Sequence, residues 1–437
     1  MAFPNLSEFS GRVDCFTPDL RALGRLKGSD LSVVDLSDCH LSELGIQGLC
    51  KGSPNLKRLC LSSGSCKLES VDATVQSIVA NCPKIETLSF DNWFKLTTQS
   101  MQYLSQLEFL RELNLDGCSP TSVAVQAFLR VNQRLESLVF CYDWDVECDI
   151  ALIIIDSSLL ACIGLNCPKL TKLMFELHET SDVTDASLTD MLRGCPLLEE
   201  LRFAGFKKPN TLLPTLGACC PRLKRLFLSA LSFTDNDVTA LCQGCPALLS
   251  LRLPQCHYLS NVAVETIASH CKKLQELVLT ESSTVTDHSM SALFSSCTCL
   301  RSVQLGQLAL LTSRSVLALL LNCPLLQSLS LDWEYSLIND LIAASANESE
   351  AAELIRSKAI TDETLAQIPV CCKELKILRL SHCHAISRAG VWALIDNCKR
   401  LTELEVYNCR FSNPTAECRK KYVAIGERYR GLKVSWF

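Results

Sequence analysis

The chain has 437 residues, a formal net charge of −5 and 48% hydrophobic residues, which is enough for a large buried core. Its mild acidity is atypical of a general nucleic-acid-binding protein, which needs a basic stripe. The longest apolar runs, residues 151–155 and 316–321, are far shorter than a membrane span, and residues 1–16 contain no signal-peptide core. We therefore expect a protein of the cytoplasm and/or nucleus that binds neither nucleic acid nor membrane.

One short phrase recurs along the chain: an aliphatic residue, two variable residues, an apolar residue, one variable residue and another apolar residue. Most copies lie 25 to 29 residues apart, with longer steps before Leu170 and Leu375. A period of this length with this core is the leucine-rich-repeat signature. After a degenerate copy at residues 31–36, the phrase begins at Leu56, Ile85, Leu110, Leu135, Leu170, Leu198, Leu223, Leu248, Leu274, Leu300, Leu326, Leu375 and Leu401.

The second half of each unit has the pattern of a helix. Threonine and aspartate recur at one register and open segments with apolar residues at helical spacing, such as Val238 and Leu241. Either side chain can accept hydrogen bonds from the unpaired amides of a first helical turn. Each unit is thus predicted to run strand, loop, helix. The helix starts are Val183-Thr184-Asp185, Phe233-Thr234-Asp235, Val285-Thr286-Asp287 and Ile360-Thr361-Asp362.

Residues 30–410 resemble the cysteine-containing leucine-rich repeat of F-box/LRR proteins and of the antagonist-of-mitotic-exit-network family. The copy that follows this pattern most closely contains Val391, Leu394, Cys398, Leu401, Leu404, Val406 and Cys409. The resemblance implies an α/β solenoid, a horseshoe of about 13–14 repeats with a parallel concave sheet and helices on the convex side.

We expect an N-terminal cap over residues 1–30, one solenoid over residues 31–409 and a C-terminal cap over residues 410–437. Insertions lengthen the period near residues 141–157 and 334–358, and insertions in repeat proteins often lie on the binding face. The first 30 residues are too short for an F-box and lack its usual Leu-Pro opening. The F-box-less relatives are therefore the closer match.

The 27 cysteines form a ladder in the predicted core and not a disulfide or zinc framework, because they recur at a fixed register. An odd number of cysteines with no secretion signal also indicates a reducing compartment. Cys242 and Cys245 form an isolated C-x-x-C with no second pair at zinc-finger spacing. His382 and His384 would point to different faces of an extended chain. We therefore expect no metal ion and no cofactor.

Between the buried apolar residues, the variable residues of each phrase face the concave sheet surface. They are acidic in the first third of the chain and small and polar toward the end, up to Glu403, Glu405 and Tyr407. In the middle they form a basic patch with an apolar centre, which resembles a protein interface. The alternative is a solvated face without a specific partner. The predicted concave contact residues are Lys172, Met174, Arg202, Arg225, Phe227 and Arg252.

Aromatic residues follow several strands, in the loops that lead to the helices. Exposed together along one rim they would mark a docking edge, although each ring could instead pack under its own loop. The predicted rim contact residues are Trp93, Phe94, Trp144, Phe206, Trp333 and Tyr335.

No nucleophile motif or phosphate-binding loop is present in the sequence, and we expect a protein that is not an enzyme. The first hypothesis is a monomeric adaptor or substrate-recognition subunit that binds a ubiquitin-ligase component or its substrate. The second is a structural subunit of a large cytoskeletal or ribonucleoprotein assembly. An enzyme inhibitor is the third.

Overall fold

The structure is a computed structural model that describes residues 7–10, 30–37, 39, 41–62, 70–91, 96–140, 154–177, 181–204, 211–228, 233–308, 310–332, 360–409 and 432–436. It divides into two compact units, Met1–Leu223 and Lys224–Phe437, called unit 1 and unit 2 below.

In unit 1, strands and helices alternate, and each strand pairs in parallel with the next strand along the sequence. The degenerate first copy of the phrase forms a strand, β2. The elements are β1 Glu8–Ser10, β2 Val33–Leu36, α2 Glu43–Gly52, β3 Arg58–Ser62, α3 Val71–Asn81, β4 Thr87–Asp91, α4 Thr98–Leu104, β5 Glu112–Asn114, α5 Ser122–Val131, β6 Ser137–Val139, α6 Ser157–Asn166, β7 Lys172–Glu176, α7 Asp185–Gly194, β8 Glu200–Ala204 and α8 Leu212–Cys219.

Unit 2 repeats the same alternation with the same parallel pairing of sequential strands. Its elements are β9 Arg225–Leu228, α9 Asp235–Gly244, β10 Ser250–Leu253, α10 Asn261–His270, β11 Glu276–Thr280, α11 Asp287–Ser296, β12 Ser302–Gly306, α12 Ser313–Asn322, β13 Ser328–Asp332, α15 Asp362–Cys371, β14 Ile377–Ser381, α16 Arg388–Asn397, β15 Glu403–Tyr407 and β16 Lys433–Trp436.

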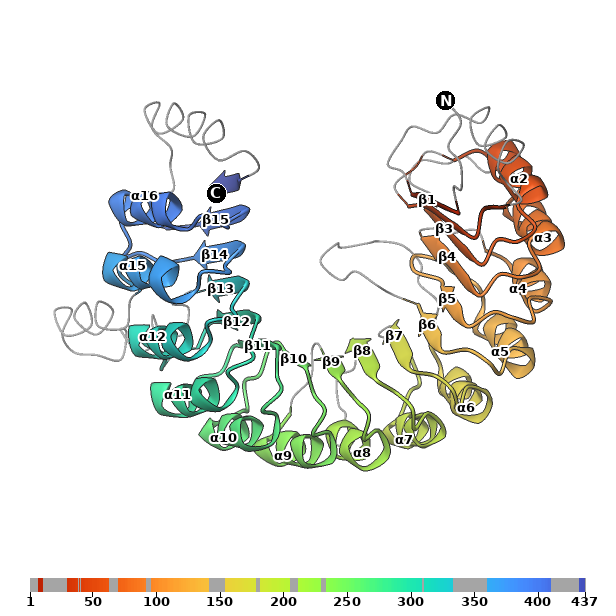
Figure 1. The fold of residues 1–437 in the computed structure, drawn as a ribbon. Coiled ribbons are helices and arrows are strands. Elements are labelled where there is room, and N and C mark those ends of the chain that lie inside the picture. The colour runs from red at the N-terminus through yellow and green to blue at the C-terminus, as the bar shows by residue number, and fades with distance from the viewer. Residues whose placement is uncertain are drawn as a thin grey trace, which may run out of the picture. The chain divides into compact units, whose positions relative to one another are not determined.

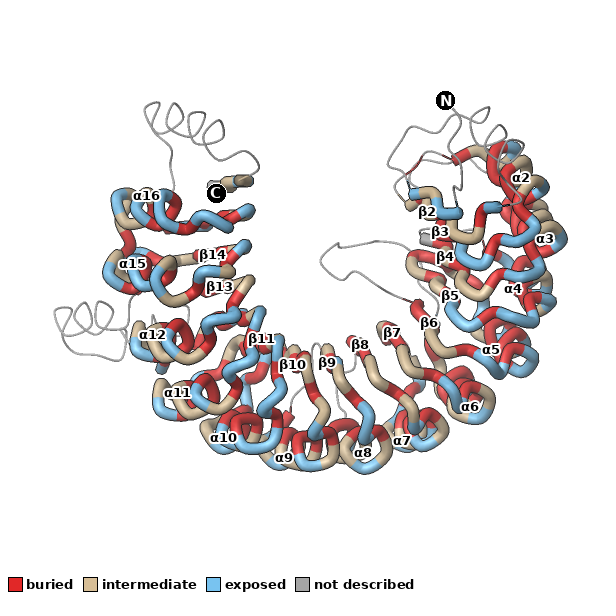
Figure 2. The backbone as a smooth tube through the Cα atoms, in the orientation of Figure 1, coloured by how far each residue is buried: buried red, intermediate tan, exposed pale blue. Residues whose placement is uncertain are grey.

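Within each unit the helices cover one face of the sheet and leave the other open (Figure 1). Buried residues lie between the two layers, and exposed residues lie mainly on the outer side of the helices (Figure 2). The apolar residues of the phrase fill this core, as Leu251 and Leu253 of β10 do at 0% exposure. The strand–loop–helix repeat predicted from the sequence is confirmed. Among the described residues, no helix has the length and apolarity to cross a bilayer.

Both long steps between repeats leave the sheet register intact. Across the first, β6 pairs with β7 and Ser137 lies opposite Lys172. Across the second, β13 pairs with β14 and Asp332 lies opposite Ser381. Most of the first predicted insertion and all of the second lie outside the described residues. So do most of the two predicted caps, whose described parts include β1, paired with β2, and β16, paired with β15.

The threonine–aspartate pairs begin helices as predicted, but the aspartate acts between repeats. Thr234 is the residue before helix α9, and Asp235 is its first residue. The Asp235 carboxylate accepts a hydrogen bond from the Ser260 backbone amide of the next repeat at 2.8 Å. Asp287 accepts the equivalent bond from the Thr312 amide at 2.9 Å, and Asp362 accepts one from Ser387 at 2.6 Å. These three carboxylates tie the start of α9 to that of α10, the start of α11 to that of α12, and the start of α15 to that of α16.

The repeat cysteines are free and mostly buried, as the predicted ladder requires. Each of several cysteines at a helix C-terminus donates its thiol to the carbonyl of the equivalent cysteine one repeat earlier. Cys195 bonds the Cys167 carbonyl at 3.7 Å, and Cys297 bonds the Cys271 carbonyl at 3.5 Å. Burial raises the pKa of the Cys195 and Cys297 thiols to about 12, so both stay protonated. A small buried side chain with one weak donor fits this position.

Cys242 and Cys245 do not act as a pair. The Cys242 thiol hydrogen-bonds the thiol of Cys271 in the next repeat, which raises the pKa of Cys242 and lowers the pKa of Cys271. Burial raises the pKa of Cys245 to about 12. Both residues of this C-x-x-C are therefore core residues of the ladder.

Candidate functional site

The predicted concave contact residues fall in two groups, three in each unit. In unit 1, Lys172 of β7 forms an ion pair with Glu200 of β8 at 3.6 Å. Arg202 is half-buried on β8 and lies opposite Met174 of β7. Met174 is only 5% exposed, so it offers almost no contact surface. The basic character predicted for this part of the open face is therefore partly neutralised.

In unit 2, Arg225, Phe227 and Arg252 lie on the open face of strands β9 and β10. Arg225 is exposed and Phe227 is half-buried. The Arg252 guanidinium lies 5.6 Å from the centre of the Phe227 ring, a cation–π distance. Its Nε donates to the Glu276 carboxylate of β11 at 2.8 Å. The cluster thus presents Arg225, which is exposed, and the Phe227 ring. It also presents Arg252, whose side chain is held by Phe227 and by Glu276.

Glu200 and Glu276 were not among the residues predicted from the sequence to shape this surface. Each occupies the first outward position of its strand: Glu200 lies opposite Lys172, and Glu276 lies opposite Ser250. Both glutamates could have been identified from the alternation of strand residues, because outward residues on neighbouring strands lie within side-chain reach of one another.

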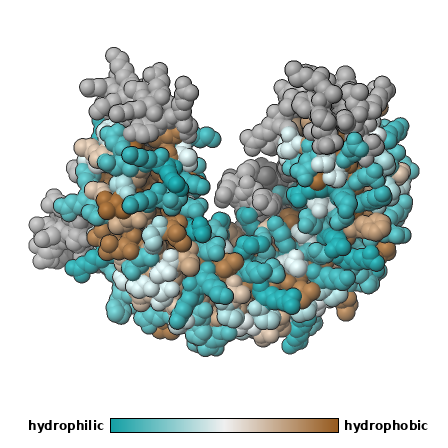
Figure 3. Space-filling view, in the orientation of Figure 1, coloured by the Kyte–Doolittle hydropathy of each residue, from teal (hydrophilic) through white to brown (hydrophobic). Residues whose placement is uncertain are grey.

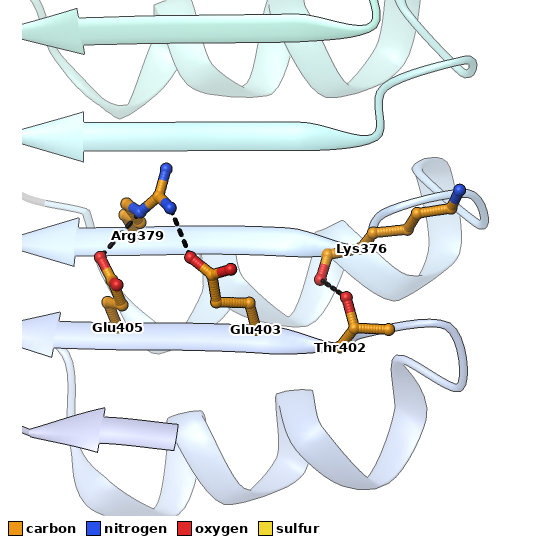
Figure 4. A network of polar contacts seen from close by, with 5 residues as sticks. All are labelled: Lys376, Arg379, Thr402, Glu403 and Glu405. Carbon is orange, nitrogen blue, oxygen red and sulfur yellow. Dashed lines mark hydrogen bonds and ion pairs between the residues drawn. The ribbon is translucent and has the colours of Figure 1, made fainter. Parts of the chain in front are cut away.

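A second charged network lies farther along the open face of unit 2 (Figure 4). Arg379 of β14 lies between two carboxylates of β15, pairing with Glu403 and with Glu405, the latter at 2.7 Å. Both glutamates were predicted to face this surface. Arg379 was not predicted there, and its guanidinium partly neutralises Glu403 and Glu405.

The two histidines after β14 come together, which corrects the expectation that they point apart. His382 has a φ of 56°, so the backbone is left-handed there and not extended. Its ring lies edge-on to His384 at 6.3 Å and to Tyr407 at 5.6 Å. His382 Nδ1 lies 3.0 Å from the Asp332 carboxylate. Among the described residues, no group of three or more potential metal ligands forms.

All of the predicted rim aromatics lie outside the described residues: Trp93, Phe94, Trp144, Phe206, Trp333 and Tyr335. Their role stays a prediction. Two tyrosines in the described part of unit 2 are exposed on this rim or next to it, Tyr258 at 66% and Tyr407 at 50%. Tyr258 was not among the predicted rim residues.

Apolar side chains also gather over helices α12 and α15 (Figure 3). Leu321 is 72% exposed and Val370 is 65% exposed there. Exposed apolar residues are common on soluble proteins, and these two helices pack against each other beneath them.

The repeated parallel strands, the helices on one face and the buried phrase residues define an α/β leucine-rich-repeat solenoid. No family model matches the chain. It is 26% identical to F-box/LRR-repeat protein 4 of Bos taurus over 193 residues, which is 42% of this chain and 29% of that protein. It is 32% identical to F-box/LRR-repeat protein 22 of Arabidopsis thaliana over 93 residues, 20% of this chain and 30% of that protein. The resemblance to F-box/LRR-repeat proteins is thus confirmed at low identity.

The chain spans less than a third of the length of both curated relatives. Among solved structures, it is similar to a chain of the Rad7 and Elc1 complex of yeast, with a TM-score of 0.56 and 17% identity. That match covers 96% of this chain and 88% of the other. At this identity the likeness concerns the fold.

Proposed function

We propose that this chain is a non-catalytic protein-interaction solenoid, an adaptor or substrate-recognition subunit in ubiquitin-dependent protein turnover. The observation that carries the proposal is the Arg225, Phe227 and Arg252 cluster on the open face of unit 2. Arginine and aromatic residues dominate the energetically important centres of protein interfaces. The F-box/LRR-repeat relatives support the ligase context.

The cluster is suited to binding because one of its arginines is already held in place. Arg252 is fixed between the Phe227 ring and Glu276, so little side-chain entropy is lost when a partner covers it. Arg225 lies exposed on the neighbouring strand β9, where a partner can contact it. We place the protein in the cytoplasm and/or nucleus, where the free thiols of the described residues stay reduced.

Affinity purification with mass spectrometry tests the proposal. Arg225→Glu reverses the exposed charge without leaving Glu276 unpaired, so it is a cleaner probe than a change at Arg252. We expect about tenfold weaker capture of the main partner, because a like charge in an interface is repulsive. Arg314→Glu, on an exposed arginine of helix α12, is the matched control and should leave capture unchanged.

Equal capture by the two variants would place the binding site elsewhere. The ligase role has its own readout in the same experiment. Absence of any cullin-adaptor protein, under conditions that recover one with a known F-box/LRR receptor, would contradict that role and leave protein binding intact.

A further inference from the structure

The loops that lead from a helix to the next strand carry an unusual charge in unit 2. The loop between α10 and β11 holds Lys272 and Lys273, and the loop between α11 and β12 holds Arg301. Lys373 and Lys376 lie between α15 and β14, and Lys399 lies between α16 and β15. All six side chains are exposed, and together they are called the basic rim: Lys272, Lys273, Arg301, Lys373, Lys376 and Lys399.

The basic rim follows one edge of the sheet, because its loops are joined by a backbone ladder. The Gln327 amide donates to the Arg301 carbonyl at 2.7 Å, and the Lys376 amide donates to the Gln327 carbonyl at 2.8 Å. With neighbouring strands about 4.8 Å apart, Arg301 and Lys376 are separated by about 10 Å. Figure 4 shows the Lys376 side chain extending away from the Arg379 network.

The carboxylates that border the basic rim are already engaged. Glu276 pairs with Arg252, Glu374 with Arg400, and Glu403 with Arg379. In the described part of unit 2, none of the six basic-rim side chains forms an ion pair. Their charges are therefore available to a partner.

The same loops of unit 1 are different, which shows that the repeat itself does not require a basic edge. There Lys57 pairs with Glu86 at 2.9 Å, and Arg111 pairs with Glu136 at 2.7 Å. The helix-to-strand loops of unit 1 also carry four carboxylates, Glu86, Glu108, Glu136 and Glu199, which offset their cations. In the described part of unit 2 the corresponding loops carry one carboxylate, Glu374, so their charge is more strongly positive.

We propose that the basic rim docks an acidic segment of a partner polypeptide. Five of the six basic-rim residues are lysines. A lysine ammonium group is a compact point charge, so a carboxylate can pair with it from many directions. Aromatic side chains, on which nucleic-acid bases would stack, do not occur in these loops. The chain's net charge of −5 also opposes general nucleic-acid binding.

This inference rests on the proposed function only in taking the partner to be a protein, and it uses a different surface. The open-face cluster at Arg225 and the basic rim can therefore fail separately. Suppose that Arg225→Glu loses the cellular partner but the basic rim does not bind an acidic peptide. The proposed function would then stand, and the inference about the basic rim would be wrong.

Fluorescence anisotropy of the full-length chain with a labelled oligoglutamate peptide tests the proposal. The triple variant Lys272→Glu, Lys273→Glu, Lys376→Glu should weaken binding about tenfold or more, since three attractive charges become repulsive. The control reverses matched exposed residues in the unit 1 loops, Lys84→Glu, Arg134→Glu and Lys169→Glu, and should change affinity less than about twofold. Binding should weaken as salt is raised.

The thermal midpoint of each variant confirms that it is folded. Three results would overturn the proposal: no binding of oligoglutamate by the unmodified chain, equal weakening in both triple variants, or tighter rim-dependent binding of a duplex DNA of matched charge. Arg225→Glu should leave oligoglutamate binding unchanged.

Discussion

At the scale of single residues, five non-glycine residues in the described part of unit 2 adopt positive φ at one position of the repeat. The second residue after the last apolar residue of the phrase has φ between 44° and 63° in these five copies: Gln255, Glu281, Gln307, His382 and Asn408. The amides of three of them, Glu281, Gln307 and His382, donate to the next strand at 2.9 Å and so extend the sheet ladder by one bond. Unit 1 has Gly117, with φ of 63°, at the same position.

Because a left-handed conformation costs an L-residue about 1 kcal/mol or more, Gln255→Gly should stabilise the protein by about 1 kcal/mol. The side chain of Gln255 is exposed, so little packing is lost. Gln255→Val should destabilise it, since a β-branched residue tolerates positive φ least. Urea unfolding midpoints measure both. A lower midpoint for the glycine variant would show that the strain argument is wrong.

At the scale of the elements, carboxylates couple three helices of unit 2 to the helix that follows each of them. Asp235 accepts from both the amide and the hydroxyl of Ser260, at 2.8 and 2.5 Å. A repeat array is stabilised by such interfaces between neighbours as well as by each repeat.

Asp235→Ala should lower the free energy of unfolding by about 1–3 kcal/mol, because it leaves the Ser260 amide without its acceptor. A double-mutant cycle of Asp235→Ala with Ser260→Ala isolates the side-chain bond, and we expect coupling of about 0.5–3 kcal/mol. Coupling near zero would mean that the Ser260 hydroxyl adds nothing to the bond between the repeats, which would then rest on the Ser260 amide alone. Asp237→Ala is a suitable comparison, because Asp237 bonds Thr234 within the same repeat.

The sequence predicts features within one repeat well, but it predicts contacts between repeats poorly. The phrase, its period and the helix starts follow from side-chain pattern, so strands, helices and the buried cysteines were predictable. The partners of Arg252 and Asp235 lie 24 and 25 residues away, on the next repeat. Such pairs become visible only when the repeats are aligned as neighbours. The left-handed residue at His382 was not predicted, because few non-glycine residues adopt that conformation and nothing in the local sequence requires it.

At the scale of the whole molecule, the solenoid offers surfaces of different chemistry. Unit 2 combines an arginine–phenylalanine cluster on its open sheet face with a basic edge of exposed lysines. Both surfaces are built from variable residues around a repeated core, so they can change without altering the fold. This separation suits a protein that recognises other proteins.

Site-specific photo-cross-linking in cells tests the central claim most directly. A benzophenone side chain introduced at position 225, on the open face of β9, is compared with one at position 314 on helix α12. We predict a discrete covalent adduct with a partner protein from position 225 and none from position 314. Adducts of equal yield from both positions, or from position 314 only, would contradict binding through the open face of unit 2.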